Sequence, residues 1–352
     1  MEFFDIVIIG AGPAGLACAK EAGKRGYSVL VLERNGQIGR KVCAGGITWN
    51  GLMRHMPGFA TERDFAKQHL FSRYQSCCIE ADHPIVATLN REHLGRSMAE
   101  QAQEAGAVIR TEEQALQIGA EKITVRERKT GRDYSVAFKY LVGADGSSSL
   151  VRRYLGQPVK HIGLGLNFQI RGRAEKMEWH LRPDLFVNGY AWIFPHQNTI
   201  SIGAYADRSI FSPTELKRRF LVWAKAQGYG LEQERCTAGY INYDYRGYRF
   251  GSDNNIFLTG DAAGLASGLT GEGIYPAIVS GIAVAEEIAG CKDHPELEAV
   301  IKSQRMQRRI LDISGRGQVL ATLLSEAMTL GMRSKILKFD TVEMAGTSSI
   351  KK

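Results

Sequence analysis

The chain has 352 residues and a mass of 38.9 kDa, with 44% hydrophobic and 23% charged residues. These values fit a folded globular protein of about two domains and exclude a disordered, collagen-like or low-complexity chain. The net charge is +8, and residues 301–352 hold ten Lys and Arg against four Asp and Glu. Without the aromatic-studded basic pattern of nucleic-acid proteins, we expect no nucleic-acid partner. The charge fits two interpretations of equal weight, peripheral contact with an anionic membrane surface or greater solubility alone.

No targeting or metal-binding pattern stands out in the sequence. The chain lacks an apolar run of about 18 residues and a basic signal-peptide head, so we expect a cytoplasmic protein that contacts a membrane at most from its surface. The six cysteines form no CxxC pair, Cys77 and Cys78 are adjacent, and the eight histidines form no ligand-spaced pair. We therefore expect reduced cysteines and no metal ion.

The first elements in the chain read as one βαβ unit. Residues 4–9 (FDIVII) form a continuous apolar run typical of a buried parallel strand, and residues 27–33 (YSVLVLE) form a second. A glycine-rich turn at residues 10–15 and a helical pattern over about 14–25 lie between them. Further elements of the same kind follow, with a helix at 90–105, a strand at 107–110, a meander at 121–142, a strand at 255–259 and a helix at 273–289.

The middle of the chain has a different hydrophobic pattern, with alternating rather than continuous apolar runs. Short alternating runs at 162–171, 185–194 and 199–206, with an amphipathic helix near 213–227, predict an antiparallel sheet with a helix packed on it. The last 60 residues are largely helical by period. Their apolar face comprises Ile310, Ile313, Val319, Leu323, Leu324 and Met328.

These patterns predict an α/β fold in which one domain interrupts another. We expect a discontinuous Rossmann-type nucleotide-binding domain at residues 1–155 and 250–300, because buried strands followed by glycine-rich turns occur on both sides of the middle segment. An inserted α+β substrate domain with an antiparallel sheet would span 156–249. A helical C-terminal region would span 301–352.

The turn after the first strand has the GxGxxG spacing of a dinucleotide site. Gly10 allows the tight turn, Gly12 lets the backbone approach a diphosphate, and Gly15 lets the helix pack closely on the strand. Glu33 ends the second strand, where a carboxylate can accept the ribose hydroxyls of FAD or NAD and disfavours a 2′-phosphate. We also assign Pro13, Ala14 and Arg34 to this nucleotide site.

Two later glycine turns, Gly143–Gly146 and Gly260-Asp261, each follow a buried strand, and this set resembles the flavoproteins of the p-hydroxybenzoate hydroxylase type. The resemblance implies FAD as the cofactor. In that superfamily the residue matching Asp261 accepts flavin ribityl or ribose hydroxyls. The amides that open the next helix, around Gly271, Glu272, Gly273 and Ile274, would face the flavin pyrimidine edge and stabilise its reduced anion.

Two further positions take roles from the same resemblance. Arg91, at the start of the helix after Asn90, matches an arginine near the flavin ribityl chain and diphosphate, with a surface helix arginine as the alternative. Asp145 has two interpretations of equal weight: it serves the diphosphate through water, or it caps the segment Gly146 to Val151.

Three segments resemble geranylgeranyl reductases: Lys41-Val42-Cys43-Ala44-Gly45-Gly46-Ile47, Tyr190-Ala191-Trp192-Ile193-Phe194-Pro195, and Gly268-Leu269-Thr270-Gly271-Glu272-Gly273-Ile274. With the flavin turns, the resemblance covers roughly residues 1–290. It places Lys41, Cys43 and Ala44 beside the cofactor. The chain departs from the pattern at Val187, where a proline is often found, and residues after 300 match no motif of the family.

The resemblance implies FAD-dependent reduction of isolated carbon–carbon double bonds in prenyl chains of a lipid or quinone. Tyr190 and Trp192 are candidate catalytic residues because aromatic faces stabilise the positive charge that develops on an alkene. Cys43 is a candidate acid or substrate-positioning group. The alternatives are core packing for the two aromatic residues and a buried spacer for the cysteine.

No second GxGxxG turn accommodates NAD(P)H, so the electron donor is either transiently docked NAD(P)H or a ferredoxin-like protein. A flavin monooxygenase or halogenase is the first alternative function, because such enzymes share the glycine turns and a similar W-x-W-x-I-P strand. Tyr190 and Cys43 favour the reductase. A non-catalytic flavoprotein partner is the second alternative.

Overall fold

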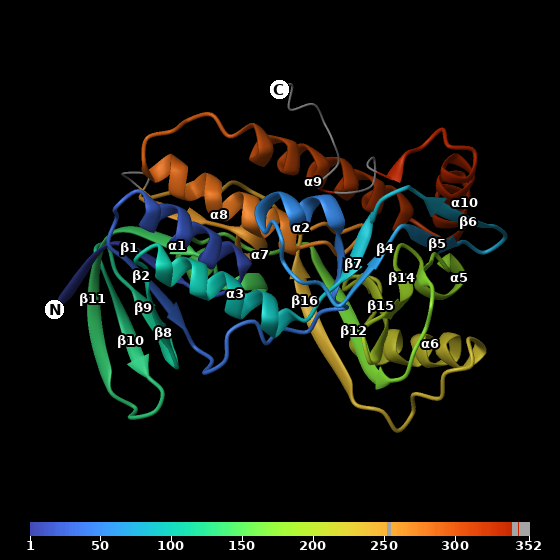
Figure 1. The fold of residues 1–352 in the computed structure, drawn as a ribbon, viewed down its shortest axis with the longest axis horizontal. Helices are drawn as coiled ribbons and strands as arrows, with labels where there is room; N and C mark the ends of the chain where they lie inside the picture. The colour runs from blue at the N-terminus through green and yellow to red at the C-terminus, as the bar shows by residue number, and fades with distance from the viewer. Residues whose placement is uncertain (252–254, 340–343, 345–352) are drawn as a thin grey trace.

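The structure is a computed structural model and describes residues 1–251, 255–339 and 344. Two large sheets lie side by side along the long axis, each with helices packed on it (Figure 1). The first sheet has the core order β17-β18-β11-β1-β2-β8, and β10 and β9 extend from β11. Its strands are β1 (Glu2–Ile9), β2 (Val29–Glu33), β8 (Val108–Thr111), β9 (Glu113–Ile118), β10 (Lys122–Glu127), β11 (Asp133–Gly143), β17 (Arg249–Phe250) and β18 (Ile256–Leu258).

The centre of this sheet is parallel. β1 pairs with β2 and β11, and β11 pairs with β18, all in parallel, with Ile9 opposite Leu32 and Gly143. The carboxyl ends of these strands therefore meet at one edge, which brings together the turns that follow them. The predicted parallel strands and the α/β class are confirmed.

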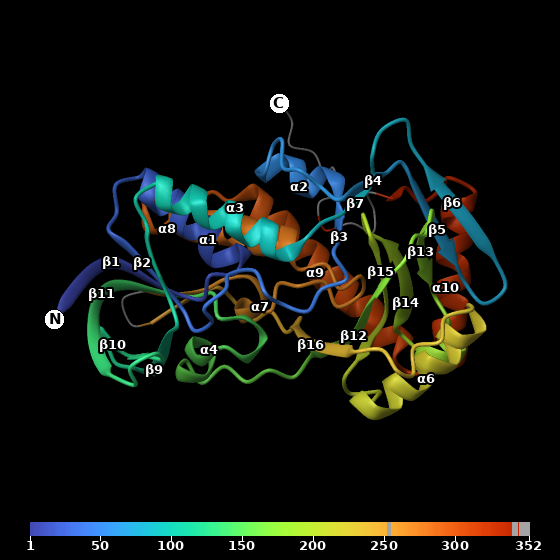
Figure 2. The ribbon, with the colours of Figure 1, turned by 60° about the horizontal axis from the view of Figure 1, so that its bottom comes forward.

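Both faces of β1 are buried, which explains its unbroken apolar run. Ile6 and Ile8 pack toward helices on one face, whereas Val7 and Ile9 pack into a second core on the other. Figure 2 shows the helices of the first face lying side by side over the sheet. They are α1 (Pro13–Lys24), α3 (Arg91–Glu104) and α8 (Ile274–Ile288), and the short helices α4 (Leu150–Tyr154) and α7 (Gly260–Ala263) lie at the carboxyl edge.

The second sheet has seven strands in the order β16-β12-β15-β14-β13-β5-β6 and is antiparallel except between β13 and β5. One face packs on α6 (Pro213–Ala226) through Leu216, Phe220 and Trp223. Its strands are β5 (Lys67–Phe71), β6 (Ser76–Glu80), β12 (Ile162–Arg171), β13 (Met177–His180), β14 (Tyr190–Pro195), β15 (Thr199–Asp207) and β16 (Cys236–Asn242). Strands β5 and β6 come from the segment assigned above to residues 1–155, and the domain boundaries stay a prediction.

The strand predicted at 185–194 begins only at Tyr190. Residues Pro183–Phe186 form the short helix α5, because proline is well suited to the first helical position. Val187 then has a positive φ of 52°, which turns the chain into β14. A third, small sheet of β3 (Gly46–Thr48), β7 (Val86–Thr88) and β4 (Arg63–Phe65), with the helix α2 (Trp49–His55), connects the two larger sheets.

The chain ends in two helices, α9 (Pro295–Ser314) and α10 (Gln318–Arg333), as the helical period predicts. α9 runs along the molecule from the first sheet toward the second, where α10 lies beside β5 and β6 (Figure 1). Much of the apolar face expected here lies at the surface, since Val319 is 75% exposed and Leu323 is 62% exposed. Residues 340–343 and 345–352 of the predicted C-terminal region lie outside the described residues. Among the helices described, none is long and apolar enough to cross a membrane.

Candidate functional site

The glycine turn after β1 is shaped by close backbone contacts. A Cβ on Gly10, whose φ is +105°, would lie 2.4 Å from the carbonyl oxygen of Ala144. A Cβ on Gly15 would lie 2.0 Å from the oxygen of Gly10, so only glycine lets α1 pack this closely on the turn. Gly12 has open space around its Cβ position, and α1 begins at Pro13. The turn thus presents the free amides of a helix N-terminus to an open space, which suits a diphosphate.

Glu33 at the end of β2 faces this turn. One carboxylate oxygen accepts the amide of Ala11 at 3.0 Å, and the other accepts the amide of Asn35 at 2.9 Å. The side chain is therefore oriented beside the glycine turn, where its remaining lone pairs can accept hydroxyl groups. Arg34 has an exposed side chain, and its carbonyl oxygen accepts a hydrogen bond from Arg128 at 2.9 Å.

Asp145 caps the helix that follows it. Its Oδ2 accepts the amide of Leu150 at 2.5 Å and that of Val151 at 3.3 Å, which fits the capping interpretation. Its Oδ1 is buried and has no hydrogen-bond partner in the described structure. Desolvation raises the pKa of this carboxyl, against the hydrogen bonds that lower it. The free oxygen remains available to a donor at the carboxyl edge of the sheet.

Asp261 lies at the start of α7, where three segments meet. Its Oδ2 accepts hydrogen bonds from Lys41 Nζ at 2.8 Å and Ser147 Oγ at 3.0 Å. The side chain of Asp261 is only 9% exposed, whereas that of Lys41 is 50% exposed. The preceding Gly260 packs on α1, because a Cβ there would lie 3.1 Å from the Cβ of Ala14.

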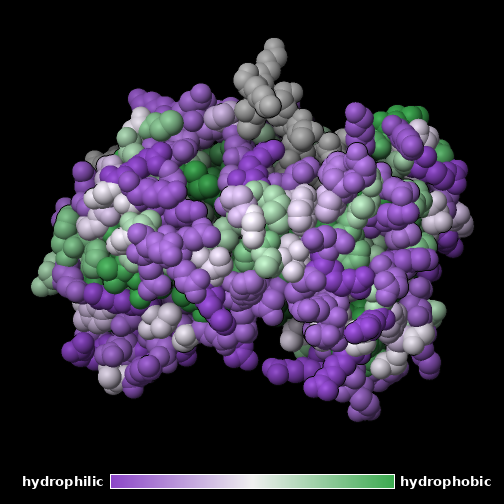
Figure 3. Space-filling view, viewed as in Figure 1, coloured by the Kyte–Doolittle hydropathy of each residue, from purple (hydrophilic) through white to green (hydrophobic). Residues whose placement is uncertain are grey.

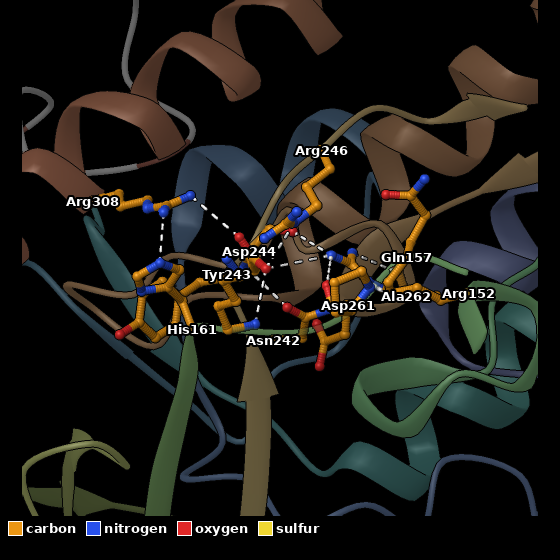
Figure 4. Close-up of polar contacts among 12 residues, drawn as sticks. Arg152, Gln157, His161, Asn242, Tyr243, Asp244, Arg246, Asp261, Ala262 and Arg308 are labelled. Atoms are coloured by element: carbon orange, nitrogen blue, oxygen red, sulfur yellow. Dashed lines mark hydrogen bonds and ion pairs between the residues drawn. The ribbon is translucent and has the colours of Figure 1, made fainter. Parts of the chain in front are cut away.

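A buried polar network fixes the main chain around Asp261 (Figure 4). Asn242 Nδ2 donates to the carbonyl oxygen of Asp261 at 2.8 Å, and Arg152 donates to that of Ala262 at 3.2 Å. Arg152 is 2% exposed and also donates to the carbonyl of Asp244 at 2.8 Å. The carboxylate of Asp244 accepts Arg308 of α9 at 3.3 Å. Removing any member would leave buried charge or carbonyl groups unpaired, so this network rigidly positions the Asp261 turn.

Arg91 opens α3 after the cap Asn90, whose side chain accepts two helix amides. Its Nη1 is buried and has no hydrogen-bond partner among the described residues. Because an unpaired buried guanidinium N–H is costly, this atom points to a polar or anionic ligand at the site. A surface arginine, the alternative above, would have its guanidinium in water.

The loop carrying Cys43 lies against the strand segment that ends β14. Cys43 is half-buried, and its sulfur accepts the amide of Gly45 at 3.3 Å. His196 Nε2 lies 3.0 Å from the carbonyl oxygen of Ala44, while Nδ1 contacts the carboxylate of Glu62. A Cβ on Gly45 would lie 2.3 Å from the His196 ring, so the loop is fitted to this histidine. The sequence analysis did not assign His196 a role.

The two candidate aromatic residues lie on the same face of β14, opposite the face that packs on α6. Tyr190 donates its hydroxyl to the carbonyl of Thr270, and Trp192 donates Nε1 to Ser201 Oγ at 3.0 Å. Their ring centroids are 6.0 Å apart. Burial raises the pKa of Tyr190, with smaller contributions from Cys43 and Glu272, so this hydroxyl keeps the proton that it donates to the carbonyl of Thr270.

The loop before α8 joins the aromatic face to the carboxyl edge of the first sheet. A Cβ on Gly271 would lie 2.9 Å from the hydroxyl of Tyr190, and one on Gly273 would lie 3.4 Å from Asp261 Oδ1. The first residue of α8 is Ile274. The structure therefore brings Tyr190 and Asp261, which are far apart in the sequence, to opposite ends of one short loop.

Glu272 in this loop was overlooked as a side chain by the sequence analysis. Its carboxylate accepts Thr48 Oγ1 at 3.2 Å and the amide of Met344 at 3.0 Å. Desolvation raises the pKa of this carboxyl to about 7, although both hydrogen bonds lower it. A carboxyl that titrates near neutrality beside Tyr190 is a candidate proton source. In the sequence, Glu272 is marked only by its position between two glycines, and this position does not predict that its side chain is buried.

An apolar pocket adjoins Tyr190 between the second sheet and α10. The space within it, including open solvent at its mouth, is about 420 Å³. None of the described residues that line it is charged. Its lining residues are Leu70, Trp179, Leu181, Tyr190, Leu269, Thr270, Met328 and Met332.

Comparisons with known proteins agree with these features. Residues 4–168 match the family model of an FAD binding domain. Digeranylgeranylglycerophospholipid reductase of Methanosarcina acetivorans is 27% identical over 310 residues, covering 80% of this chain and 74% of that protein. Digeranylgeranylglycerophospholipid reductase 2 of Methanosphaera stadtmanae is 29% identical over 306 residues, covering 79% and 76%.

Solved structures share the fold. A geranylgeranyl bacteriochlorophyll reductase-like protein from Thermoplasma acidophilum superposes with a TM-score of 0.73 at 20% identity, covering 97% of this chain and 90% of that one. A flavin-dependent brominase superposes with a TM-score of 0.68 at 18% identity, covering 98% and 93%.

The fold and the FAD-binding match define the chain as an FAD-dependent oxidoreductase. The reductase relatives agree with the resemblance to geranylgeranyl reductases that the sequence motifs indicated. The unpaired atoms of Arg91 and Asp145 and the open space at Gly12 fit FAD. The described residues contain no group of three or more His, Cys, Asp or Glu side chains able to hold a metal ion.

Proposed function

We propose that this protein reduces isolated carbon–carbon double bonds in the prenyl chain of a lipid or quinone. The observation that carries the proposal is the uncharged pocket that ends at Tyr190, next to the loop before α8. A prenyl chain has no polar group to bind, so its site needs an apolar lining. The names of the reductase relatives support the same substrate class.

The residues of the carboxyl edge fit FAD, which in its reduced form supplies hydride when bound. The glycine turn and the start of α1 would bind the diphosphate, Glu33 the ribose, and Asp261 the ribityl chain or a nearby hydroxyl. Arg91 and Asp145 have free polar atoms for the same cofactor. The full proposed set is Gly10, Gly12, Pro13, Ala14, Gly15, Glu33, Arg34, Lys41, Cys43, Ala44, Arg91, Asp145, Gly260, Asp261, Gly271, Gly273 and Ile274.

Tyr190 and Trp192 contribute their ring faces to the reaction. Protonation of an alkene generates positive charge at carbon, and the negative face of an aromatic ring stabilises that charge where water is excluded. Both rings are buried, and their polar atoms are already satisfied by Thr270 and Ser201. The donated protons of Tyr190 and Trp192 therefore need no water molecule in the pocket.

The proton has two candidate donors. Cys43 is the thiol in the segment that resembles the loop of geranylgeranyl reductases. Glu272 is a carboxyl that is protonated below a pH of about 7. We favour Glu272 as the source of the proton, with Cys43 positioning the substrate, because desolvation keeps the Glu272 carboxyl neutral until near-neutral pH. The electron donor that regenerates the reduced cofactor is NAD(P)H docking transiently or a ferredoxin-like protein.

The decisive experiment offers prenyl lipids to the reduced protein. Anaerobic holoprotein reduced with dithionite is incubated separately with a geranylgeranylated glycerophospholipid and with membrane lipid extract. The masses of the products are measured by mass spectrometry. A gain of two mass units per saturated bond supports the proposal. Lipid that is unchanged without oxygen, but is halogenated or oxygenated when oxygen and halide are supplied, would instead assign the brominase-like reaction. Lipid that is unchanged in every arm would favour a non-catalytic partner.

A further inference from the structure

Helix α10 has two different faces. On its inner face, Met328 and Met332 line the apolar pocket, and Ala321 and Thr329 are buried. The pocket therefore lies directly under this helix. Whatever covers the outer face of α10 will be separated from the pocket by the thickness of one helix.

The outer face is an exposed apolar stripe. Val319 is 75% exposed, Leu323 is 62% exposed and Leu330 is 48% exposed, and their spacing of four and seven residues places them on one side of the helix. Just beyond the helix, Ile336 is 81% exposed. Figure 3 shows apolar side chains gathered at the upper right, over α10, with hydrophilic side chains around them. A run of this kind on one helix is typical of a contact surface.

Positive charges flank the stripe at both ends. Arg316 precedes α10, and Arg333, Lys335 and Lys338 follow its last turn; all four are exposed. The single acidic residue between 316 and 339 is Glu326, which comes three residues after Leu323 and four before Leu330 and therefore lies on the same side of the helix as the stripe. Its carboxylate accepts Ser72 Oγ at 2.8 Å and the amide of Tyr74 at 3.1 Å. The turn between β5 and β6 thus binds the carboxylate of Glu326, and none of the four cations has an ion-pair partner among the described residues, so the outer surface combines apolar side chains with unpaired cations.

We propose that this surface docks the protein on an anionic lipid bilayer. The α10 surface comprises Val319, Leu323, Leu330 and Ile336 with Arg316, Arg333, Lys335 and Lys338. An amphipathic helix with apolar and basic side chains binds at the interface by burying the former among acyl chains and attracting anionic headgroups with the latter. Docking to a soluble protein or to a second copy of the chain would not by itself explain why cations lie at both ends of the stripe.

The inference rests on the proposed function in one respect: it explains how a membrane-embedded prenyl chain reaches the pocket. With the bilayer against the outer face of α10, the pocket lined by the inner face lies beside the leaflet from which the chain must be withdrawn. The charged headgroup can then stay at the interface while the apolar tail enters, which avoids the cost of desolvating the headgroup.

The test uses full-length holoprotein and sedimentation with two kinds of vesicle, phosphatidylcholine alone and phosphatidylcholine with 30% phosphatidylglycerol. We expect binding to the anionic vesicles and much weaker binding to the neutral ones. The double variant Leu323→Glu/Leu330→Glu should lower the partition coefficient at least about tenfold on both. Val222→Glu is the matched control, because Val222 is an apolar side chain of α6 that is 57% exposed.

Charge variants separate the electrostatic part. Replacing Arg333 and Lys335 with Gln should weaken binding to anionic vesicles by about fivefold per cation and leave binding to neutral vesicles unchanged. Wild-type binding equal to that of Leu323→Glu/Leu330→Glu would overturn the proposal. So would a concentration-dependent dimer in analytical ultracentrifugation that this double variant abolishes, since the stripe would then join two copies.

Failure of this inference can be told from failure of the proposed function. Vesicle binding requires no turnover, so it tests the α10 surface even if no prenyl lipid is reduced. If reduction occurs, the apolar double variant should lose activity on lipid embedded in vesicles and retain activity on the same lipid dispersed in detergent. Equal activity of variant and wild type on vesicles would contradict the docking role while leaving the reductase intact.

Discussion

The two ends of the candidate site are built in different ways. At the carboxyl edge of the first sheet, backbone geometry sets the site: the turn at Gly10 to Gly15 admits no side chain at its tight positions. At the pocket, the surface is made mainly by side chains, from β5, β13, β14, α10 and the turn that contains Leu269 and Thr270. A fixed diphosphate needs a fixed cradle, whereas an apolar chain needs volume and exclusion of water. Substitutions should therefore act in an all-or-none way at the first end and in a graded way at the second.

The largest effect is expected from Gly15→Val. Its Cβ would start 2.0 Å from the oxygen of Gly10, so α1 must move off the turn and the cradle is lost. We expect purified Gly15→Val protein to be colourless, as measured by flavin absorbance. Gly12→Ala is the control: its Cβ meets open space, so the fold should be unchanged by circular dichroism while flavin affinity falls. If Gly15→Val protein retained bound flavin, the expected all-or-none response at the carboxyl edge would be wrong.

Blocking the pocket should affect substrate but not cofactor. In Leu181→Trp a larger ring enters the pocket lining, and we expect kcat/KM for a prenyl lipid to fall by about 100-fold because the chain is displaced from its reacting position. Flavin content should match wild type. The exposed Val222→Trp serves as the control for a surface tryptophan. Equal kcat/KM for Leu181→Trp and wild type would place the substrate elsewhere.

The pH dependence tests Glu272. Desolvation raises the pKa of its carboxyl from 4.5 to about 7, so the acid can donate a proton below that pH and has lost it above. We expect the rate of holoprotein to fall about tenfold per pH unit above 7. Glu272→Gln should be slow and flat over the same range.

The same shift has a consequence for stability. The folded protein holds the Glu272 proton between pH 4.5 and about 7, where the unfolded chain releases it. The stabilisation from this group is complete below pH 4.5 and is lost as pH rises through about 7. Thermal unfolding should show this fall in wild type and not in Glu272→Gln; parallel curves would mean that Glu272 titrates normally.

The smallest effects should come from the aromatic face. Tyr190→Phe keeps the ring but removes the hydroxyl that holds Thr270, so the loop before α8 loses one tether and we expect the rate to fall about tenfold. Trp192→Phe loses the bond to Ser201, farther from that loop, and should cost less than about fivefold. Steady-state kinetics at saturating lipid would rank them. A larger loss for Trp192→Phe would make Trp192 the principal ring.

The contrast between the two ends also explains what could be read from the sequence. The positions of the glycine turn and of Glu33 beside it were predictable because they depend on a local spacing between a strand and a helix, and Asp261 was selected by the family resemblance. The contacts of Glu272 and His196 were not predictable, since their partners Thr48, Met344 and Glu62 are distant in the chain. The pairing of β5 with β13 and the pocket under α10 depend on the same kind of long-range contact.

The apolar period of the C-terminal helices predicted helices correctly but not their environment. A helical pattern shows which side chains share a face, and Val319 and Leu323 do share one. It does not show whether that face meets a core or the solvent. The exposure of this face depends on the packing of α10 against β6 of the second sheet, which brings together residues distant in the chain.

The central claim is most directly tested by following the absorbance of reduced holoprotein under strict exclusion of oxygen. Addition of a geranylgeranyl lipid should restore the oxidised flavin spectrum, with one flavin reoxidised for each double bond that is saturated. A reduced spectrum that persists with the lipid and recovers only when oxygen is admitted would contradict the account.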